Sequence, residues 1–78
     1  MGRPINPQPA LGDAIRQLRT KRGISQEDLA HLAGVTTGTL SVIERGKSNP
    51  AWGTVKSIAA ALGVSVADVA KLAEKHER

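Results

Sequence analysis

The side chains that most often serve as catalytic nucleophiles or bases are scarce in this sequence, and its acidic residues are dispersed at the starts and ends of predicted helices. It contains no cysteine and only two histidines, His31 and His76. His31 falls on the outer side of a predicted helix, and His76 lies in the polar C-terminal end. There is no glycine-rich phosphate loop, and a domain this small is expected to lack the volume of a ligand pocket, about 300 Å³ or more. The sequence therefore predicts no enzyme, no metal or other cofactor and no small-molecule ligand.

The charge of the chain favours an anionic partner. Its 78 residues carry a formal net charge of +4, which is one feature of a nucleic-acid-binding domain. The absence of cysteine excludes disulfides and thiolate zinc sites and is compatible with a reducing compartment. No apolar run approaches the roughly 18 residues of a membrane span, and the N-terminus lacks the apolar core of a signal peptide. We expect a cytoplasmic protein without a membrane partner.

Residues 1–10 and 11–78 differ in composition. The first segment holds three of the four prolines, which disfavour helix, so it is predicted to be a flexible arm. The arm is either an inert tail or a segment that lays Arg3 along a DNA groove. From Leu11 onwards, Leu11, Ile15 and Leu18 form the apolar stripe of a first helix, which Gly23 ends.

Four further helices follow at short intervals. Ser25 is the predicted N-cap of the second helix, which ends at Gly34, and Thr36 is that of the third, which ends at Gly46. A polar loop, 47–50, leads to a fourth helix over about 51–62, and Ser65 caps a fifth. The two-residue period of a strand is absent, so the predicted fold is all-α, a compact five-helix domain.

The segment Gln26 to Ile43, QEDLAHLAGVTTGTLSVI, carries the functional signal. Small Ala30 allows two short helices to pack closely, Val35 fills the corner between them, and Leu40 and Ile43 anchor the second helix on the core. This is the pattern of a helix-turn-helix, whose second helix is presented to the DNA major groove.

The sequence also resembles the Cro-like and phage-repressor-like helix-turn-helix family, of the xenobiotic-response-element type. The matching runs are LGDAIRQLRTKRGISQEDLA, AGVTTGTLSVIERGKSNP and TVKSIAAALGVSVADV, which cover about residues 11–70. The resemblance implies a five-helix repressor-like fold in which the helix over about 36–45 recognises DNA. It also implies a set of DNA-binding residues: Gln26, Thr36, Thr37, Gly38, Thr39, Val42, Lys47, Ser48 and Asn49.

Within that set the implied roles differ. Gln26 is implied to face a phosphate, although simple capping of its helix is the alternative. Thr37, Gly38 and Val42 are implied to face bases, with Thr36 and Thr39 nearer the phosphates. The loop 47–49 is implied to lie against the phosphate backbone, or it is an ordinary solvated turn.

Two of the base-facing positions depart from the commoner family pattern. Gly38 and Val42 cannot make the bidentate hydrogen bonds that arginine or glutamine make to bases, whereas Thr37 and Val42 can touch thymine methyls. We therefore expect modest direct readout and more reliance on DNA shape. Gly38 either permits close backbone approach to DNA or is a tolerated helix defect. The resemblance further implies that Arg19 and Glu44 form a structural ion pair between the first and third helices.

A regulator that reads two half-sites needs a dimer interface. The candidates are surplus apolar residues of the fourth and fifth helices: Trp52, Val64, Val66, Val69 and Leu72. Trp52 is otherwise expected to close the bottom of the monomer core. Larger repressors of the family carry an oligomerisation domain, so this chain is either a small complete regulator or a DNA-binding part.

The sequence thus predicts a sequence-specific regulator of transcription that binds double-stranded DNA, as a homodimer on an inverted repeat. Controller proteins of restriction–modification systems, prophage regulators and antitoxin-type repressors all fit this description. The alternative is an adaptor of the same fold that binds other proteins, which the few hydrogen-bonding groups on the third helix would suit.

Overall fold

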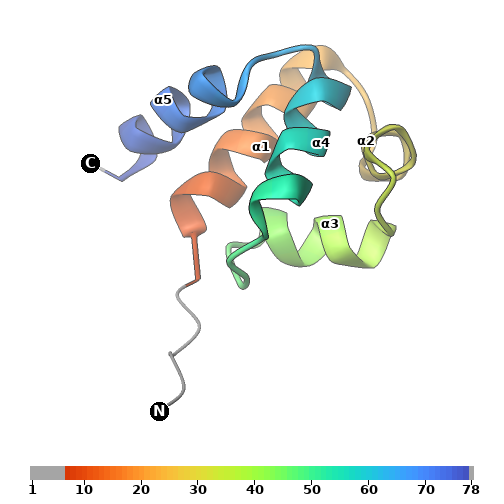
Figure 1. Ribbon diagram of the computed structural model, residues 1–78, viewed down its shortest axis with the longest axis horizontal. Coiled ribbons are helices and arrows are strands. Elements are labelled where there is room, and N and C mark those ends of the chain that lie inside the picture. The colour runs from red at the N-terminus through yellow and green to blue at the C-terminus, as the bar shows by residue number, and fades with distance from the viewer. Residues whose placement is uncertain (1–6, 78) are drawn as a thin grey trace.

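The computed structural model describes residues 7–77, and these residues form five α-helices without a strand. The helices are α1 (Pro9–Arg22), α2 (Gln26–Ala33), α3 (Thr37–Glu44), α4 (Trp52–Leu62) and α5 (Val66–His76). Helix α1 packs against α3, α4 and α5, and α2 packs against α3 and α4. In Figure 1, α5 and α3 lie on opposite sides of α1. The predicted all-α fold is confirmed.

The N-termini of two helices, α2 and α5, are capped by pairs of reciprocal hydrogen bonds between side chain and backbone. At α2 the Ser25 hydroxyl accepts from the Asp28 N–H at 3.0 Å, and the Asp28 carboxylate accepts from the Ser25 N–H at 3.3 Å. Ser65 and Asp68 repeat this capping box at α5, with distances of 3.0 and 3.1 Å. Each box satisfies backbone donors that the helix itself leaves free. Local sequence therefore sets where these helices start.

Helix α1 begins at Pro9, two residues before the predicted start at Leu11. Proline suits the first position of a helix because it lacks the N–H that would be unpaired there. The preceding Gln8 donates its N–H to the Ser48 carbonyl at 3.1 Å, which attaches this end of α1 to the loop after α3. Pro9 and Ala10, which were predicted to belong to the arm, therefore belong to α1, and Arg3 lies outside the described residues.

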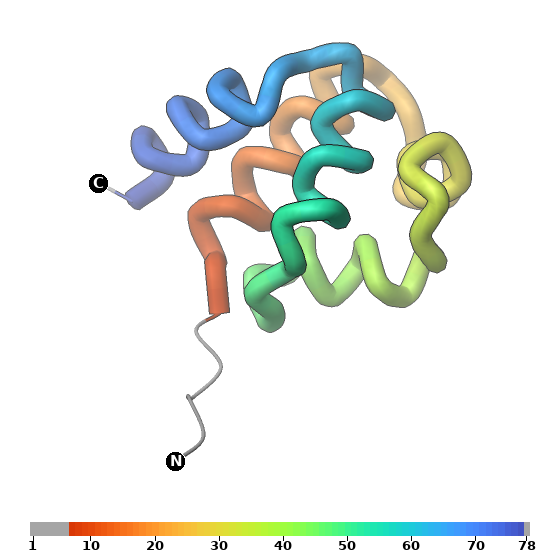
Figure 2. The backbone as a smooth tube through the Cα atoms, viewed as in Figure 1, coloured from red at the N-terminus to blue at the C-terminus, as the bar shows by residue number. Residues whose placement is uncertain are grey.

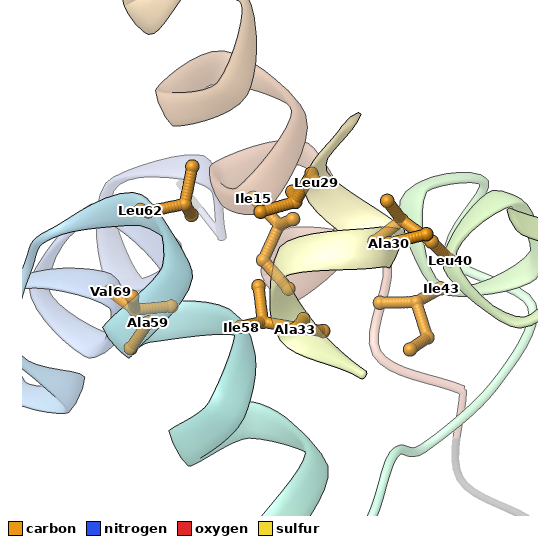
Figure 3. Packing of buried hydrophobic residues seen from close by; sticks show 10 residues of the cluster. All are labelled: Ile15, Leu29, Ala30, Ala33, Leu40, Ile43, Ile58, Ala59, Leu62 and Val69. Atoms are coloured by element: carbon orange, nitrogen blue, oxygen red, sulfur yellow. The ribbon is translucent and has the colours of Figure 1, made fainter. Parts of the chain in front are cut away.

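An aliphatic core joins all five helices. Figure 3 shows the buried cluster, which consists of Ile15, Leu29, Ala30, Ala33, Leu40, Ile43, Ile58, Ala59, Leu62 and Val69. Val69 brings α5 into this cluster with only 1% of its surface exposed. Since the chain has no Phe or Tyr, close packing here depends on small and branched side chains.

One glycine sets the distance between α1 and α3. A Cβ placed on Gly12 would lie 2.2 Å from the Ile43 carbonyl oxygen, well inside van der Waals contact. Gly12 therefore lets the backbone of α1 approach the C-terminal turn of α3 directly. This contact helps to fix the position of α3 on the domain.

Candidate nucleic-acid interface

Helices α2 and α3 are joined by a tight turn. Gly34 adopts a φ of 73°, and the Val35 N–H donates to the Ala30 carbonyl at 3.0 Å, which closes the end of α2. Figure 2 shows α2 nearly end-on while α3 runs across the lower edge of the molecule. The inner face of α3 is anchored in the core by Leu40, with none of its surface exposed, and by Ile43. Its outer face is thus held firmly and left open.

That outer face carries the hydroxyl groups expected from the sequence. Thr36, Thr37, Gly38 and Thr39 are all exposed, and Val42 is half-buried. The Thr36 hydroxyl caps α3 by accepting from the Thr39 N–H at 3.0 Å, and it donates to the Thr39 hydroxyl at 2.9 Å. The Thr37 hydroxyl makes no hydrogen bond within residues 7–77. Thr37 is therefore the threonine of this group best placed to bind an external ligand.

Behind this face, α3 is tied to α1 by a buried ion pair. The Arg19 guanidinium donates from Nε to Glu44 Oε2 at 2.7 Å and from Nη2 to Glu44 Oε1 at 3.0 Å. Only 2% of the Glu44 side chain is exposed. The hydrogen bond to Glu44 raises the pKa of Arg19, against the opposing effect of desolvation. Both carboxylate oxygens of Glu44 accept hydrogen bonds from Arg19, so the negative charge of α3 is neutralised inside the domain and does not face the outer surface.

Gln26 belongs to the same network, which the sequence did not indicate. Its amide nitrogen donates to Glu44 Oε1 at 3.0 Å. It does not cap its own helix, because Ser25 holds that position. The bond to Glu44 sets the direction of the Gln26 amide and leaves its second N–H available to an acceptor outside the protein.

The loop after α3 presents cations and one hidden hydroxyl. Lys47 and Asn49 are exposed, whereas the Ser48 hydroxyl is buried and has no hydrogen-bond partner in the described part of the chain. Ser48 therefore does not present its hydroxyl as expected and must change rotamer to reach a phosphate. Arg45, which the sequence reasoning missed, is exposed directly after α3. Its positive charge and its position two residues before Lys47 could have indicated a phosphate-binding residue from the sequence.

An open apolar groove lies at the other end of this loop. This tryptophan groove, between the starts of α1 and α4 and one flank of α5, has a volume of about 460 Å³. Its apolar lining includes Leu11, Pro50, Trp52, Val55, Val66 and Ala73. Trp52 is 64% exposed, so it does not close the monomer core. The expectation that so small a domain lacks a cavity of ligand size is wrong, because helices that meet at an angle leave open grooves between them.

The predicted dimer residues do not form one surface. Trp52, Val66 and Val69 all line the tryptophan groove, but Val69 is also part of the core and, with 1% exposure, offers almost nothing to a second chain. Val64 packs against the core, and Leu72 lies on the opposite flank of α5. Of the predicted dimer residues on α5, Val69 therefore serves the core of the monomer.

Two other kinds of site are absent from the described residues. No helix over residues 7–77 is long and apolar enough to cross a membrane. No group of three or more His, Cys, Asp or Glu side chains in that range could hold a metal ion.

Comparison with known proteins identifies the class that this fold and surface define. The helix-turn-helix family profile matches residues 15–69. The regulator SinR of Bacillus subtilis is 41% identical over 68 residues, which is 86% of this chain and 60% of SinR. The regulator DdrOP3 of Deinococcus deserti is 37% identical over 59 residues, 76% of this chain and 46% of that protein. The chain thus spans about half the length of these curated relatives.

Solved structures agree. The clp gene regulator ClgR of Corynebacterium glutamicum superposes with a TM-score of 0.87 at 37% identity, covering 91% of this chain and 92% of that one. The restriction–modification controller protein C.AhdI of Aeromonas hydrophila gives 0.78 at 32% identity, covering 80% and 94%. The chain belongs to the Cro-like helix-turn-helix family of transcription regulators, which are DNA-binding proteins and not enzymes.

Proposed function

We propose that this chain binds a specific operator in double-stranded DNA, as a homodimer in the cytoplasm, with one α3 in the major groove of each half-site. The observation that carries the proposal is the pairing of a firmly anchored inner face of α3 with an exposed N-terminal half. In a helix-turn-helix the N-terminal residues of the second helix contact the base edges.

The bases are read by few polar groups. Thr37 offers a free hydroxyl and a methyl, and Val42 offers methyl groups to thymine. Gly38 has no side chain, and a Cβ built there would meet only the Thr36 hydroxyl, at 3.9 Å. The backbone of α3 therefore approaches the floor of the groove more closely than a larger residue would allow. Specificity then depends on methyl contacts and on the shape of the DNA.

Phosphates fix the register of the domain on the duplex. Exposed Arg45 and Lys47 supply positive charge at the end of α3, and Asn49 supplies amide donors. Gln26, in the first turn of α2, offers a further donor. Its side-chain amide is oriented by the hydrogen bond to Glu44, and the second N–H of that amide remains available to a phosphate. Helix N-termini favour anions, which adds to this contact. These residues set affinity more than sequence preference.

A second copy of the chain meets the first through the tryptophan groove. Trp52 lies at the edge of the groove of its own chain. In a two-fold dimer the same patch of both chains meets, so each indole can enter the groove of the other chain. Aromatic residues are enriched at the centres of such interfaces. The start of α4 follows directly on the loop after α3, so this interface lies close to the proposed phosphate contacts.

Selection from random duplex DNA in the presence of non-specific competitor tests the proposal. We expect enrichment of an inverted repeat with half-site centres about 10 base pairs apart, one helical turn. Thymines should appear where Thr37 and Val42 face the bases. Failure to enrich any sequence at moderate salt would contradict specific binding.

An adaptor that binds proteins is the second candidate, favoured by the lack of bidentate hydrogen-bonding side chains on the outer face of α3. The salt dependence of DNA binding separates the two. Each phosphate contact should contribute a slope of about −0.9 in a plot of log affinity against log salt. An adaptor would bind duplexes weakly and without sequence preference.

A further inference from the structure

A second groove runs along the opposite flank of α5, where that helix packs against the C-terminal half of α1. This lysine groove has a volume of about 260 Å³ and is lined by Gln17, Leu18 and Lys21 of α1 and by Asp68, Lys71, Leu72 and Lys75 of α5. It shares no lining residue with the tryptophan groove. A dimer formed through the tryptophan groove would therefore leave the lysine groove open.

Charge is distributed unevenly around the lysine groove. Lys21, Lys71 and Lys75 are exposed, and none of them forms an ion pair within residues 7–77. The one carboxylate of the groove, Asp68, is directed to the Ser65 N–H in the capping box at the start of α5. Lys71 lowers the pKa of Asp68 only as a lesser cause, after the hydrogen bonds from Ser65. The lining of the groove thus carries three lysines and a single carboxylate, which already has a partner.

The floor of the groove is apolar. Leu18 and Leu72 are half-buried there, and Leu18 packs against the core below. Apolar surface flanked by like charges is the arrangement that protein interfaces use, with the apolar contact at the centre and complementary charge at the rim. DNA phosphates would need the lysines but would gain nothing from the two leucines.

The groove also lies away from the recognition helix. Helix α5 packs against α1 and α4, whereas α3 packs against α1 and α2. Figures 1 and 2 place α5 and α3 on opposite sides of α1. A duplex bound by α3 therefore leaves this surface exposed on the far side of the domain.

We infer that the lysine groove is a docking site for an acidic segment of another protein. An apolar side chain of that segment rests on Leu18 and Leu72, and its Asp and Glu side chains pair with Lys21, Lys71 and Lys75. The site is separate from the proposed DNA surface, so the protein can hold DNA and this partner together. Charge complementarity is what selects an acidic protein segment as the occupant.

The test uses the full isotope-labelled chain and a short synthetic peptide in which two leucines are flanked by Asp and Glu. Nuclear magnetic resonance titration should shift amides around Leu18 and along 68–75 and leave those of α3 in place. A matched peptide with Asn and Gln in place of the acids should bind about tenfold more weakly or worse, because the rim charges are then unused.

Substitutions of exposed lysines test the binding site without disturbing the fold, because these side chains make no contacts in the core. Lys71→Glu with Lys75→Glu should weaken the acidic peptide by about tenfold or more, since attraction becomes repulsion. Lys56→Glu, an exposed lysine of α4 outside the groove, is the matched control and should change little. Binding that survives the double reversal would overturn the inference.

Two further outcomes would also overturn it. The first is the absence of shifts at millimolar peptide. The second is a random-sequence duplex that shifts the groove amides while the acidic peptide does not, which would make this a second nucleic-acid surface. Neither outcome bears on operator binding by α3, which the selection experiment measures separately.

Discussion

Glu44 is an acidic residue at the end of α3, the helix proposed to enter the major groove, and it precedes the proposed phosphate contact Arg45. Its carboxylate accepts three hydrogen bonds, two from Arg19 and one from Gln26. Removing it leaves the half-buried Arg19 guanidinium with the Ile24 carbonyl, to which Nη1 donates at 3.0 Å, but without its anionic partner. We expect Glu44→Ala to reduce the free energy of unfolding by about 3 to 5 kcal/mol, as measured by urea denaturation.

Asp13 provides the control for that change. It pairs with Arg16 at 3.4 Å, and both side chains are largely exposed, at 42% and 60%. Asp13→Ala should cost less than about 1 kcal/mol. Equal losses in the two variants would show that the pair between α1 and α3 contributes no special stability.

Gly38 offers a test of close approach to DNA. Glycine within a helix is less stable than alanine by about 1 kcal/mol, so Gly38→Ala should raise the free energy of unfolding by about that amount. If the backbone of α3 approaches the bases, the same change should weaken operator binding. A Cβ on Gly53, in α4, would likewise meet open space. Gly53→Ala should therefore stabilise the fold to a similar degree, which gives the effect of helix propensity alone. Operator binding that is unchanged in Gly38→Ala would contradict the close approach of α3 to the bases.

The close contact between α1 and α3 depends on Gly12, which has no side chain to separate the two helices. Gly12→Ala would force a Cβ against the Ile43 carbonyl, which is backbone and cannot move aside alone. We expect a loss of about 1 to 3 kcal/mol or more in thermal or urea unfolding, despite the better helix propensity of alanine. Gly38→Ala, in a helix with open space, is the comparison. Unchanged stability of Gly12→Ala would mean that the two helices are not held at this distance.

The start of α5 should respond to acid. Hydrogen bonds from the Ser65 backbone and hydroxyl lower the pKa of Asp68 in the folded chain. A group with a lowered folded pKa contributes stability above its unfolded value, about 3.9 for Asp, and this is lost as the pH falls through the folded value. Asp68→Asn should thus lower the urea midpoint at neutral pH, and the difference should shrink below about pH 4. A difference that is constant with pH would contradict the assigned role of the carboxylate.

Assembly is decided at the scale of the whole molecule. Trp52 is 64% exposed, so replacing it should scarcely affect the monomer, whereas a dimer through the tryptophan groove should lose its central contact. We expect Trp52→Ser to raise the dimer dissociation constant by about tenfold or more in sedimentation equilibrium. Leu32 is similarly exposed, at 60%, but lies on α2. A Leu32→Ser variant that dissociates as readily would place the interface elsewhere.

Much of the fold could be predicted because its signals are local. Caps at Ser25, Thr36 and Ser65 and the stop at Gly34 act within a few residues, so the sequence pattern specifies them directly. The start of α1 was misplaced because proline is typical of helix breaks, although Pro9 is well suited to the first helical position. The helix-turn-helix itself was predictable because its turn and its apolar contacts fall within one short segment.

What the sequence by itself determined, then, is the set of helices, their buried stripes and the class of protein. Only the tertiary structure decided what those helices present to their surroundings. It turned Gln26 onto Glu44, buried Val69 in the core, and left Trp52 and Leu72 in separate grooves on opposite flanks of α5. The reason is physical: caps and periodicity act along a few residues, whereas burial and side-chain partners depend on how distant helices cross, which no local pattern specifies.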